Sequence, residues 1–155
     1  IGYLAGLAHD ICKNMEDSEI LSLASEDGAS ISEIEKNKPS LLHGRAAAVL
    51  LQKKFSVKNL DVIQAVANHT LGGAGLCPLA KIIYVADKVE PGRPQSTEEY
   101  RKKLFSLPLN SMTLFVVQEN MEYLKNRQKK IADSSYEFEA DLKNQIAAEN
   151  SLRAS

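Results

Sequence analysis

Apolar residues recur along most of this chain every three or four positions, the interval that gathers them on one face of an α-helix. Two clear examples are the sets Leu42, Ala46, Val49, Leu50 and Leu60, Ile63, Val66, Ala67. Few segments show the two-residue alternation of a half-buried strand. The spacing therefore predicts an all-α domain.

Capping residues and glycines indicate where the first helices begin and end. Side chains of Ser, Asp and Asn accept hydrogen bonds from the free backbone N–H groups of a first helical turn. We therefore expect helices over residues 17–25, 41–54 and 60–69, capped by Asp17 or Ser18, by Ser40 and by Asn59. Gly28 and the run Gly72–Gly73–Ala74–Gly75 break the chain between helices.

Proline positions outline the second half of the chain. Pro78 suits the first turn of a helix that carries Asp87, because the N–H that proline lacks has no helical partner there. Residues 82–85, Ile-Ile-Tyr-Val, also favour a strand, but the flanking Ala and Lys residues extend the helical pattern. We then expect a loop over 89–95, a helix opened by a capping box of Ser96 and Glu99 and ended by Pro108, a long helix through 112–124, and a last helix from near Tyr136.

Size and charge narrow the range of partners. The 155 residues match one ordinary domain, and an apolar fraction of 44% is enough for a hydrophobic core. The formal net charge of -1 gives no overall field that would attract nucleic acid or an anionic membrane, so we expect neither partner. Basic clusters at 101–103 and 125–130 are flanked by acids, which favours solvated helix faces, although a local role in holding phosphate stays open.

Cysteine usage indicates the compartment. Cys12 and Cys77 are far apart in sequence and show neither the paired spacing of a zinc ribbon nor a disulfide framework. Such usage is typical of a reducing environment. No apolar stretch reaches the roughly 20 residues that span a bilayer, and no basic region followed by a cleavable apolar core stands at the start. We expect a cytoplasmic protein.

Histidines and acids supply the candidate chemistry. His9 and Asp10 are adjacent, His43 and His69 stand near predicted helix ends, and Asp87 follows an apolar run. Imidazole nitrogens and carboxylate oxygens suit borderline or hard divalent ions such as iron, manganese or zinc. A carboxylate is costly to bury without a cation, which favours metal binding by the His9–Asp10 pair over a structural core histidine. These residues suggest a metal-dependent hydrolytic site.

Structural alternatives exist for the other candidates. Asp87 could form a salt bridge with Lys88 or Lys81 instead of binding a metal. His43 could pack against the neighbouring proline turn, and a protonated His69 would be favoured at a helix end by the dipole alone. From the residues themselves, the functional and structural interpretations of these two histidines are nearly balanced.

Two cations and a glycine stand close to these candidates in sequence. Lys13 lies one helical turn from Asp10, and Arg93 follows Asp87 on a loop and carries a planar fork suited to phosphate oxygens. A solvent-exposed charge is the alternative for each cation. Gly44, beside His43, is expected to leave room for a ligand to approach the backbone.

Four strings in the sequence resemble those of a known family: 5–13 (AGLAHDICK), 41–44 (LLHG), 68–70 (NHT) and 81–93 (KIIYVADKVEPGR). They resemble the HD-domain phosphohydrolases and, among these, the YqeK-type proteins, which hydrolyse diadenosine tetraphosphate symmetrically. The resemblance is strong to about residue 93 and looser beyond it. It implies that the all-α fold is an HD-domain helical bundle.

The resemblance also implies roles for the candidate residues. The implied ligands of one or two divalent ions, with iron expected first and manganese or zinc open, are His9, Asp10, His43, His69 and Asp87. The implied catalytic residues are Asp10, His43 and His69, and the implied substrate contacts are these three with Lys13 and Arg93. By position, residues 130–135 correspond to a segment that helps to cover the nucleotide, although the His-Pro usual there is absent. The implied partner is a dinucleotide with ADP as product, and the choice between monomer and homodimer stays open.

One family feature does not occur in this sequence. The family carries a further histidine on a helix upstream of the His-Asp pair, and no histidine precedes His9. Because the chain lacks an initiating Met and its apolar start has no cap, we expect a single HD domain over residues 1–155 whose first helix and first His ligand were lost by truncation. Natural loss of this ligand would instead favour non-catalytic nucleotide binding. A third alternative is hydrolysis of a deoxynucleoside triphosphate, a cyclic nucleotide or a guanosine polyphosphate.

Overall fold

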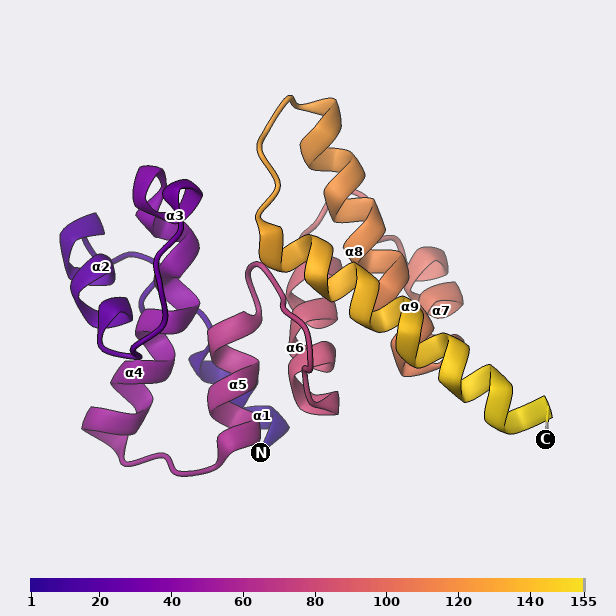
Figure 1. The fold of residues 1–155 in the computed structure, drawn as a ribbon, viewed down its shortest axis with the longest axis horizontal. Helices are drawn as coiled ribbons and strands as arrows, with labels where there is room; N and C mark the ends of the chain where they lie inside the picture. Colours follow the sequence, from indigo (N-terminus) through magenta and orange to yellow (C-terminus); the bar gives the residue numbers. More distant parts are fainter. Residues whose placement is uncertain (155) are drawn as a thin grey trace.

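The computed structural model describes residues 1–154, and this part of the chain is built from helices without strands (Figure 1). The prediction of an all-α fold is confirmed, including a helix rather than a strand over 82–85. None of the described helices is both long and apolar enough to cross a bilayer. The elements are α1 (Gly2–Ala8), α2 (Asp17–Ser25), α3 (Glu33–Asn37), the 3-10 helix η1 (Pro39–Leu42), α4 (His43–Phe55), α5 (Leu60–Asn68), α6 (Pro78–Val89), α7 (Glu98–Phe105), α8 (Leu109–Asn126) and α9 (Asp133–Ala154).

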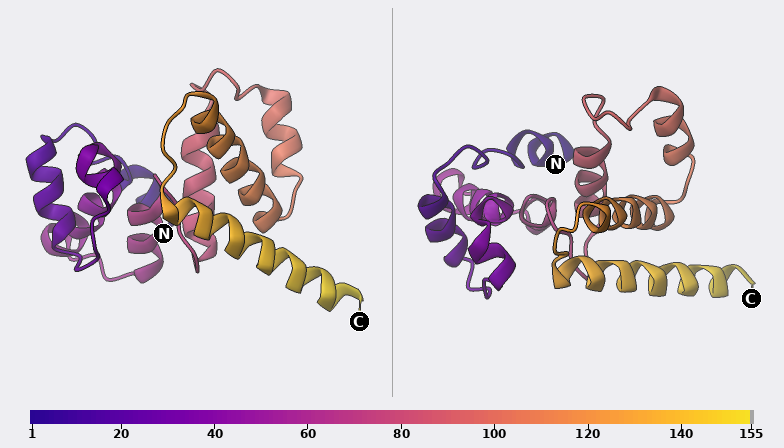
Figure 2. Two further views of the ribbon diagram at one scale, coloured as in Figure 1. Left: turned by 45° about the horizontal axis from the view of Figure 1, so that its top comes forward. Right: turned by 90° about the horizontal axis from the view of Figure 1, so that it is seen from above.

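Most of the helices pack against one another in a row, each contacting the next. α2 packs on α4, α4 on α5, α5 on α6, α6 on α8 and α8 on α9, while α1 lies against both α5 and α6. One cluster of buried apolar side chains extends through this series, from Ala5 in α1 to Leu142 in α9. The C-terminal half of α9 projects beyond the other helices in every view, and its buried residues all lie in its first half (Figure 2).

The predicted boundaries are right where one residue sets the helix start locally. The side chain of Asn59 accepts a hydrogen bond from the Val62 N–H at 3.0 Å and caps α5 as predicted. Pro78 occupies the first position of α6. α2 spans the predicted residues, but Glu16 rather than Asp17 or Ser18 is its N-cap.

Other boundaries were predicted wrongly. Ser40 does not cap a helix, because Pro39 starts a 3-10 turn and the α-helix begins only at His43. Thr97 rather than Ser96 caps α7, because the Thr97 hydroxyl accepts from the Tyr100 N–H, while the Ser96 hydroxyl donates to the Val89 carbonyl oxygen and accepts from Arg101. The remaining differences are the end of α7 at Phe105 before Pro108, the start of α9 at Asp133 before Tyr136, and the unpredicted helix α3.

The first half of α9 fixes the loop that follows α5. Gly72 has a positive φ of 75°, and a Cβ added there would lie 2.2 Å from the ring of Phe138. The Ser135 hydroxyl donates to the Leu71 carbonyl oxygen at 2.8 Å, and the Gly75 N–H donates to the Asp141 carboxylate at 2.9 Å. A glycine is therefore required at position 72 both by the backbone conformation and by the ring packed against it.

Candidate functional site

The ends of four helices converge, and each brings a candidate residue. His9 directly follows α1, His43 begins α4, His69 directly follows α5, and Asp87 lies near the end of α6. Asp10, like His9, stands in the turn after α1. The structure therefore brings the five predicted ligands together.

Distances within this cluster are short enough for shared coordination. One ligand atom from each of His9, Asp10 and His69 lies within 4.8 Å of the others. The Nε2 atom of His43 lies 3.0 Å from Asp10 Oδ1 and 2.9 Å from His69 Nε2. Asp87 lies on the same side of the bundle, with its Oδ1 atom 3.9 Å from His9 Nε2.

All three histidine rings are oriented in the same way. The Nδ1 atom of each lies 2.7 or 2.8 Å from the backbone carbonyl three residues earlier, which belongs to Gly6, Ser40 and Val66 respectively. A carbonyl oxygen only accepts, so each Nδ1 carries the hydrogen. In a neutral ring this leaves the Nε2 lone pair directed at the centre of the cluster, as in metal-binding histidines whose other nitrogen is hydrogen-bonded.

Burial differs among the three rings. The His69 side chain is 1% exposed, and this burial lowers its pKa to about 4, with the neighbouring His43 acting in the same direction. His69 is therefore neutral at pH 7 and keeps its Nε2 lone pair. The rings of His9 and His43 both pack edge-on against His69, with centroids 4.8 and 4.7 Å away.

The donor set fits a divalent cation. Three imidazole nitrogens and two carboxylates from different elements face one another, and such mixed nitrogen and oxygen donors suit iron, manganese or zinc. Asp10 is charged at neutral pH: burial acts against its ionised form, but the hydrogen bond from Lys13 and the nearby His9 lower its pKa overall. A cation held between these groups would satisfy lone pairs that otherwise face each other.

Lys13 and Arg93, the predicted substrate contacts, both reach the carboxylates of the cluster. Lys13 Nζ donates to Asp10 Oδ2 at 2.6 Å. Arg93 Nη2 donates to the Asp87 carbonyl oxygen at 3.0 Å and lies 3.3 Å from Asp87 Oδ1. The Lys13 and Arg93 side chains are 52% and 39% exposed, so a ligand can approach both.

Lys88 was considered in the sequence only as a salt-bridge partner of Asp87. Its ammonium group donates to the His69 carbonyl oxygen at 2.8 Å, lies 3.5 Å from Asp87 Oδ2 and sits 3.8 Å from the centre of the Tyr84 ring. Burial lowers its pKa to about 8, and Asp87 opposes this shift. Lys88 therefore joins α6 to the end of α5 beside the cluster. Its position directly after Asp87 was the available signal.

Gly44 has a different role from the one predicted. A Cβ added there would lie 2.7 Å from the Val66 carbonyl oxygen and 3.0 Å from the His69 ring. The space beside Gly44 is thus filled by α5 and is not open to a ligand. The glycine instead lets α4 and α5 approach closely enough to bring His43 to His69.

Comparison with protein families agrees with this arrangement. A family model described as HD domain matches residues 2–92, a segment that contains the whole cluster. The chain belongs to the HD domain family. The resemblance to HD-domain proteins is confirmed, and the four strings that carried it lie in or at the edge of the matched segment of this HD domain.

Two named relatives are similar to this chain in sequence. The chain is 26% identical over 133 residues to the symmetrical bis(5'-nucleosyl)-tetraphosphatase of Bacillus subtilis, and this alignment covers 86% of this chain and 71% of that protein. It is 34% identical over 96 residues to a probable nicotinate-nucleotide adenylyltransferase/Ap4A hydrolase of Mycoplasma genitalium, which covers 60% of this chain but 26% of that protein. The match to the Mycoplasma protein therefore involves only about a quarter of its length.

A solved structure resembles the fold beyond the matched segment. It is described as a predicted HD superfamily hydrolase involved in NAD metabolism from Clostridium acetobutylicum. The TM-score is 0.82 at 27% sequence identity, with 91% of this chain and 75% of that chain covered. The similarity supports the HD-type helical bundle over most of the described residues.

Proposed function

We propose that this HD domain hydrolyses diadenosine tetraphosphate symmetrically and releases two ADP. The observation that carries the proposal is the convergence of three histidine Nε2 atoms and two carboxylates on one centre. The names of the relatives support the substrate, since the Bacillus protein is called a symmetrical bis(5'-nucleosyl)-tetraphosphatase and the Mycoplasma name includes Ap4A hydrolase.

The proposed ligand set has two parts that share one carboxylate. His9, Asp10 and Asp87 hold one divalent ion, and His43 and His69 complete a second position or contact a phosphate. Asp10 connects the parts, because Oδ2 lies 3.5 Å from His9 Nε2 and Oδ1 lies 3.0 Å from His43 Nε2. Iron is the first proposal for the metal, and the same donors accommodate manganese or zinc. When bound, such an ion lowers the pKa of a bound water and neutralises charge on phosphate oxygens.

The cations of the chain act on the phosphates. Lys13 and Arg93 are placed to hold phosphate oxygens around the reacting phosphorus and to stabilise the departing ADP, the Arg93 fork through paired hydrogen bonds. In the cleavage, a water oxygen forms a bond to one central phosphorus while the bond from that phosphorus to the central bridging oxygen breaks. One ADP takes up the water oxygen, the other leaves with the bridging oxygen, and the water proton goes to solvent.

Product analysis in isotopic water tests this proposal. The chain is purified without chelator, its metal content is measured, and diadenosine tetraphosphate is hydrolysed in ¹⁸O-labelled water. ADP should be the sole product, and half of the ADP molecules should carry one ¹⁸O. AMP with ATP would contradict symmetrical cleavage, and faster turnover of a deoxynucleoside triphosphate, a cyclic nucleotide or a guanosine polyphosphate would assign another substrate. Absence of both bound metal and turnover would contradict the proposal.

A further inference from the structure

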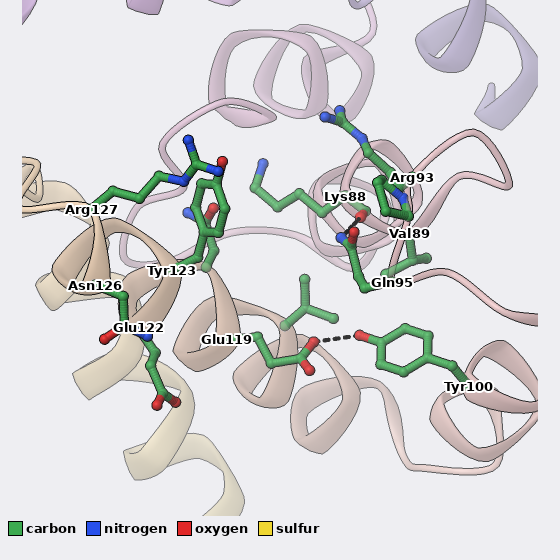
Figure 3. Close-up of a pocket in the computed structure, with 13 residues that line it drawn as sticks. Lys88, Val89, Arg93, Gln95, Tyr100, Glu119, Glu122, Tyr123, Asn126 and Arg127 are labelled. Atoms are coloured by element: carbon green, nitrogen blue, oxygen red, sulfur yellow. Dashed lines mark hydrogen bonds between the residues drawn. The ribbon is translucent and has the colours of Figure 1, made fainter.

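A cavity of about 700 Å³ lies beside the candidate site, between the end of α6, the loop that follows it, α7 and α8 (Figure 3). Its volume is in the range of about 300–1,000 Å³ that holds small ligands in proteins. Figure 3 shows Tyr123 from α8 and Arg127 directly after it on one side, Arg93 and Gln95 from the loop on the other, and Lys88 between them. The cavity is thus lined by elements that meet only in the folded chain.

Two residues connect this cavity to the metal-ligand cluster. Lys88 and Arg93 line the cavity, and both also contact Asp87, at 3.5 Å and 3.3 Å from its carboxylate oxygens. A ligand whose phosphates lie at the cluster can therefore extend into the cavity past these two cations.

The lining changes in chemistry away from the cluster. Lys88 and Arg93 supply positive charge at the end near Asp87, where phosphate would lie. Further along, the guanidinium of Arg127 stands 4.9 Å from the centre of the Tyr123 ring, which forms a flat surface of the kind on which nucleobases stack. Asn120 also lines this part of the cavity, and its side chain is hydrogen-bonded to Tyr84.

The far wall of the cavity is held in place by a contact between two helices. The Tyr100 hydroxyl on α7 donates a hydrogen bond to the Glu119 carboxylate on α8, and both residues line the cavity (Figure 3). This hydrogen bond, together with the Tyr100 ring lying 6.4 Å from that of Phe115 on α8, joins α7 to α8 across the cavity.

We propose that this cavity binds the nucleoside of one half of the dinucleotide, with Tyr123 and Arg127 stacking on the base and Lys88 and Arg93 beside its phosphates. The inference rests on the proposed function and assigns substrate recognition to residues of α8, which lies outside the family-matched residues 2–92. The cavity is also separate from residues 130–134, which line a different cavity against α5 and the segment around α3.

Kinetics of paired variants test the inference. Tyr123→Ala should raise KM for diadenosine tetraphosphate about tenfold, as expected for loss of one stacked base, while kcat stays within about twofold. Tyr123→Phe should keep the wild-type KM. Phe55→Ala is the matched control, since the Phe55 side chain is similarly exposed, 59% against 51%, but lies at the end of α4. Arg127→Ala should likewise raise KM, whereas Lys125→Ala, two residues earlier in the last turn of α8 but outside the cavity, should not. A KM for Tyr123→Ala equal to that of Phe55→Ala would overturn the inference.

A binding measurement separates this inference from the proposed reaction. The full chain has five tyrosines, so fluorotyrosine labelling gives few NMR resonances, and the one lost in Tyr123→Phe is that of Tyr123. ADP should shift this resonance, and inorganic pyrophosphate, which has no base, should leave it in place. If the chain hydrolyses the dinucleotide but ADP does not shift Tyr123, the inference fails and the reaction stands. If ADP shifts Tyr123 but no hydrolysis occurs, the reaction fails and nucleoside binding at the cavity is supported.

Discussion

The Nε2 atoms of His43 and His69 face each other at 2.9 Å, although the Nδ1 atom of each ring is already hydrogen-bonded to a backbone carbonyl. Because burial keeps His69 neutral at pH 7, its Nε2 can only accept. A proton on His43 or a cation at the centre satisfies this contact. The geometry of the two rings therefore favours a positively charged ligand at the cluster.

Replacing Asp87 tests whether the cluster binds a metal. In Asp87→Asn one anionic donor is lost while the side-chain size is kept. Bound metal should fall at least about tenfold, since even the outer hydrogen-bond partners of metal ligands are worth ~10–100-fold in affinity. Elemental analysis after dialysis against a fixed free metal concentration measures the change. Asp61→Asn, at an exposed position of α5, is the control, and equal metal content in the two variants would refute binding by Asp87.

The close approach of α4 and α5 can be tested at Gly44. Gly44→Ala places a Cβ 2.7 Å from the Val66 carbonyl oxygen and should destabilise the fold by about 1–3 kcal/mol, the usual cost of overpacking. It should also reduce metal binding, because His69 must move. In Gly6→Ala the added Cβ meets nothing within 4 Å, so this helical substitution should stabilise the fold by about 0.4–1 kcal/mol. Urea unfolding followed by circular dichroism compares the two, and equal effects would contradict the close contact.

Lys13 offers a test of phosphate binding that is separate from stability. Lys13→Ala removes a half-exposed ion pair with Asp10 and should change the free energy of unfolding by about 1 kcal/mol or less. Its kcat/KM should nevertheless fall at least about tenfold, because a charged hydrogen bond to phosphate is lost. Lys36→Ala is a close control, since Lys36 forms an equivalent i,i+3 pair with Glu33 at the same 2.6 Å. A kcat/KM as high in Lys13→Ala as in Lys36→Ala would exclude the proposed contact.

Acid should weaken the fold at the Asp27–Arg45 pair. Burial acts against the charged form of Asp27, but two hydrogen bonds from Arg45 at 2.7 Å and one from the Ala29 N–H lower its pKa below the ordinary 3.8. With a lower pKa in the folded state, the stabilisation is complete above pH 3.8 and is lost as the pH falls below it. The free energy of unfolding of Asp27→Asn at pH 7 should therefore be about 2 kcal/mol lower than that of the wild type. This difference should shrink as the pH falls below 3.8.

Unfolding curves recorded over a pH series give this comparison. Glu33→Gln serves as the control, because the Glu33 carboxylate also pairs with a cation, Lys36, but is exposed at the surface. A difference between Asp27→Asn and the wild type that persists unchanged to pH 2 would show that the pair does not titrate with folding.

Helices with local start signals could be predicted from the sequence. Asn59 and Pro78 act on their own first turns, so α5 and α6 were placed correctly. α3 was missed although Ser32 and Glu35 form a capping box, because five helical residues are too few to show an apolar period. The start of α4 was misplaced because capping by Ser40 competes with the tight turn that Pro39 favours.

The residues of the site could be predicted from the sequence, but the contacts among them could not. His9, Asp10 and Asp87 stand in recognisable strings, whereas the 3.9 Å distance between His9 and Asp87 depends on how α1 lies against α6. The residues of α8 that line the cavity have no motif. Arg127 stands in the basic cluster that favoured a solvated face, and Tyr123 marked only the long helix over 112–124. The packing of α8 on α6 brings both near Lys88.

The ring of Phe138 under Gly72 has a practical consequence for anyone who shortens this chain. The family-matched segment stops at residue 92, yet Gly72, in the loop directly after His69, packs against Phe138 of α9. A protein trimmed to that segment would keep every proposed metal ligand but lose the contact with α9 that supports the loop next to His69. The smallest working unit thus reaches at least into the first turns of α9, and excised fragments should be judged by their metal affinity rather than by their helix content.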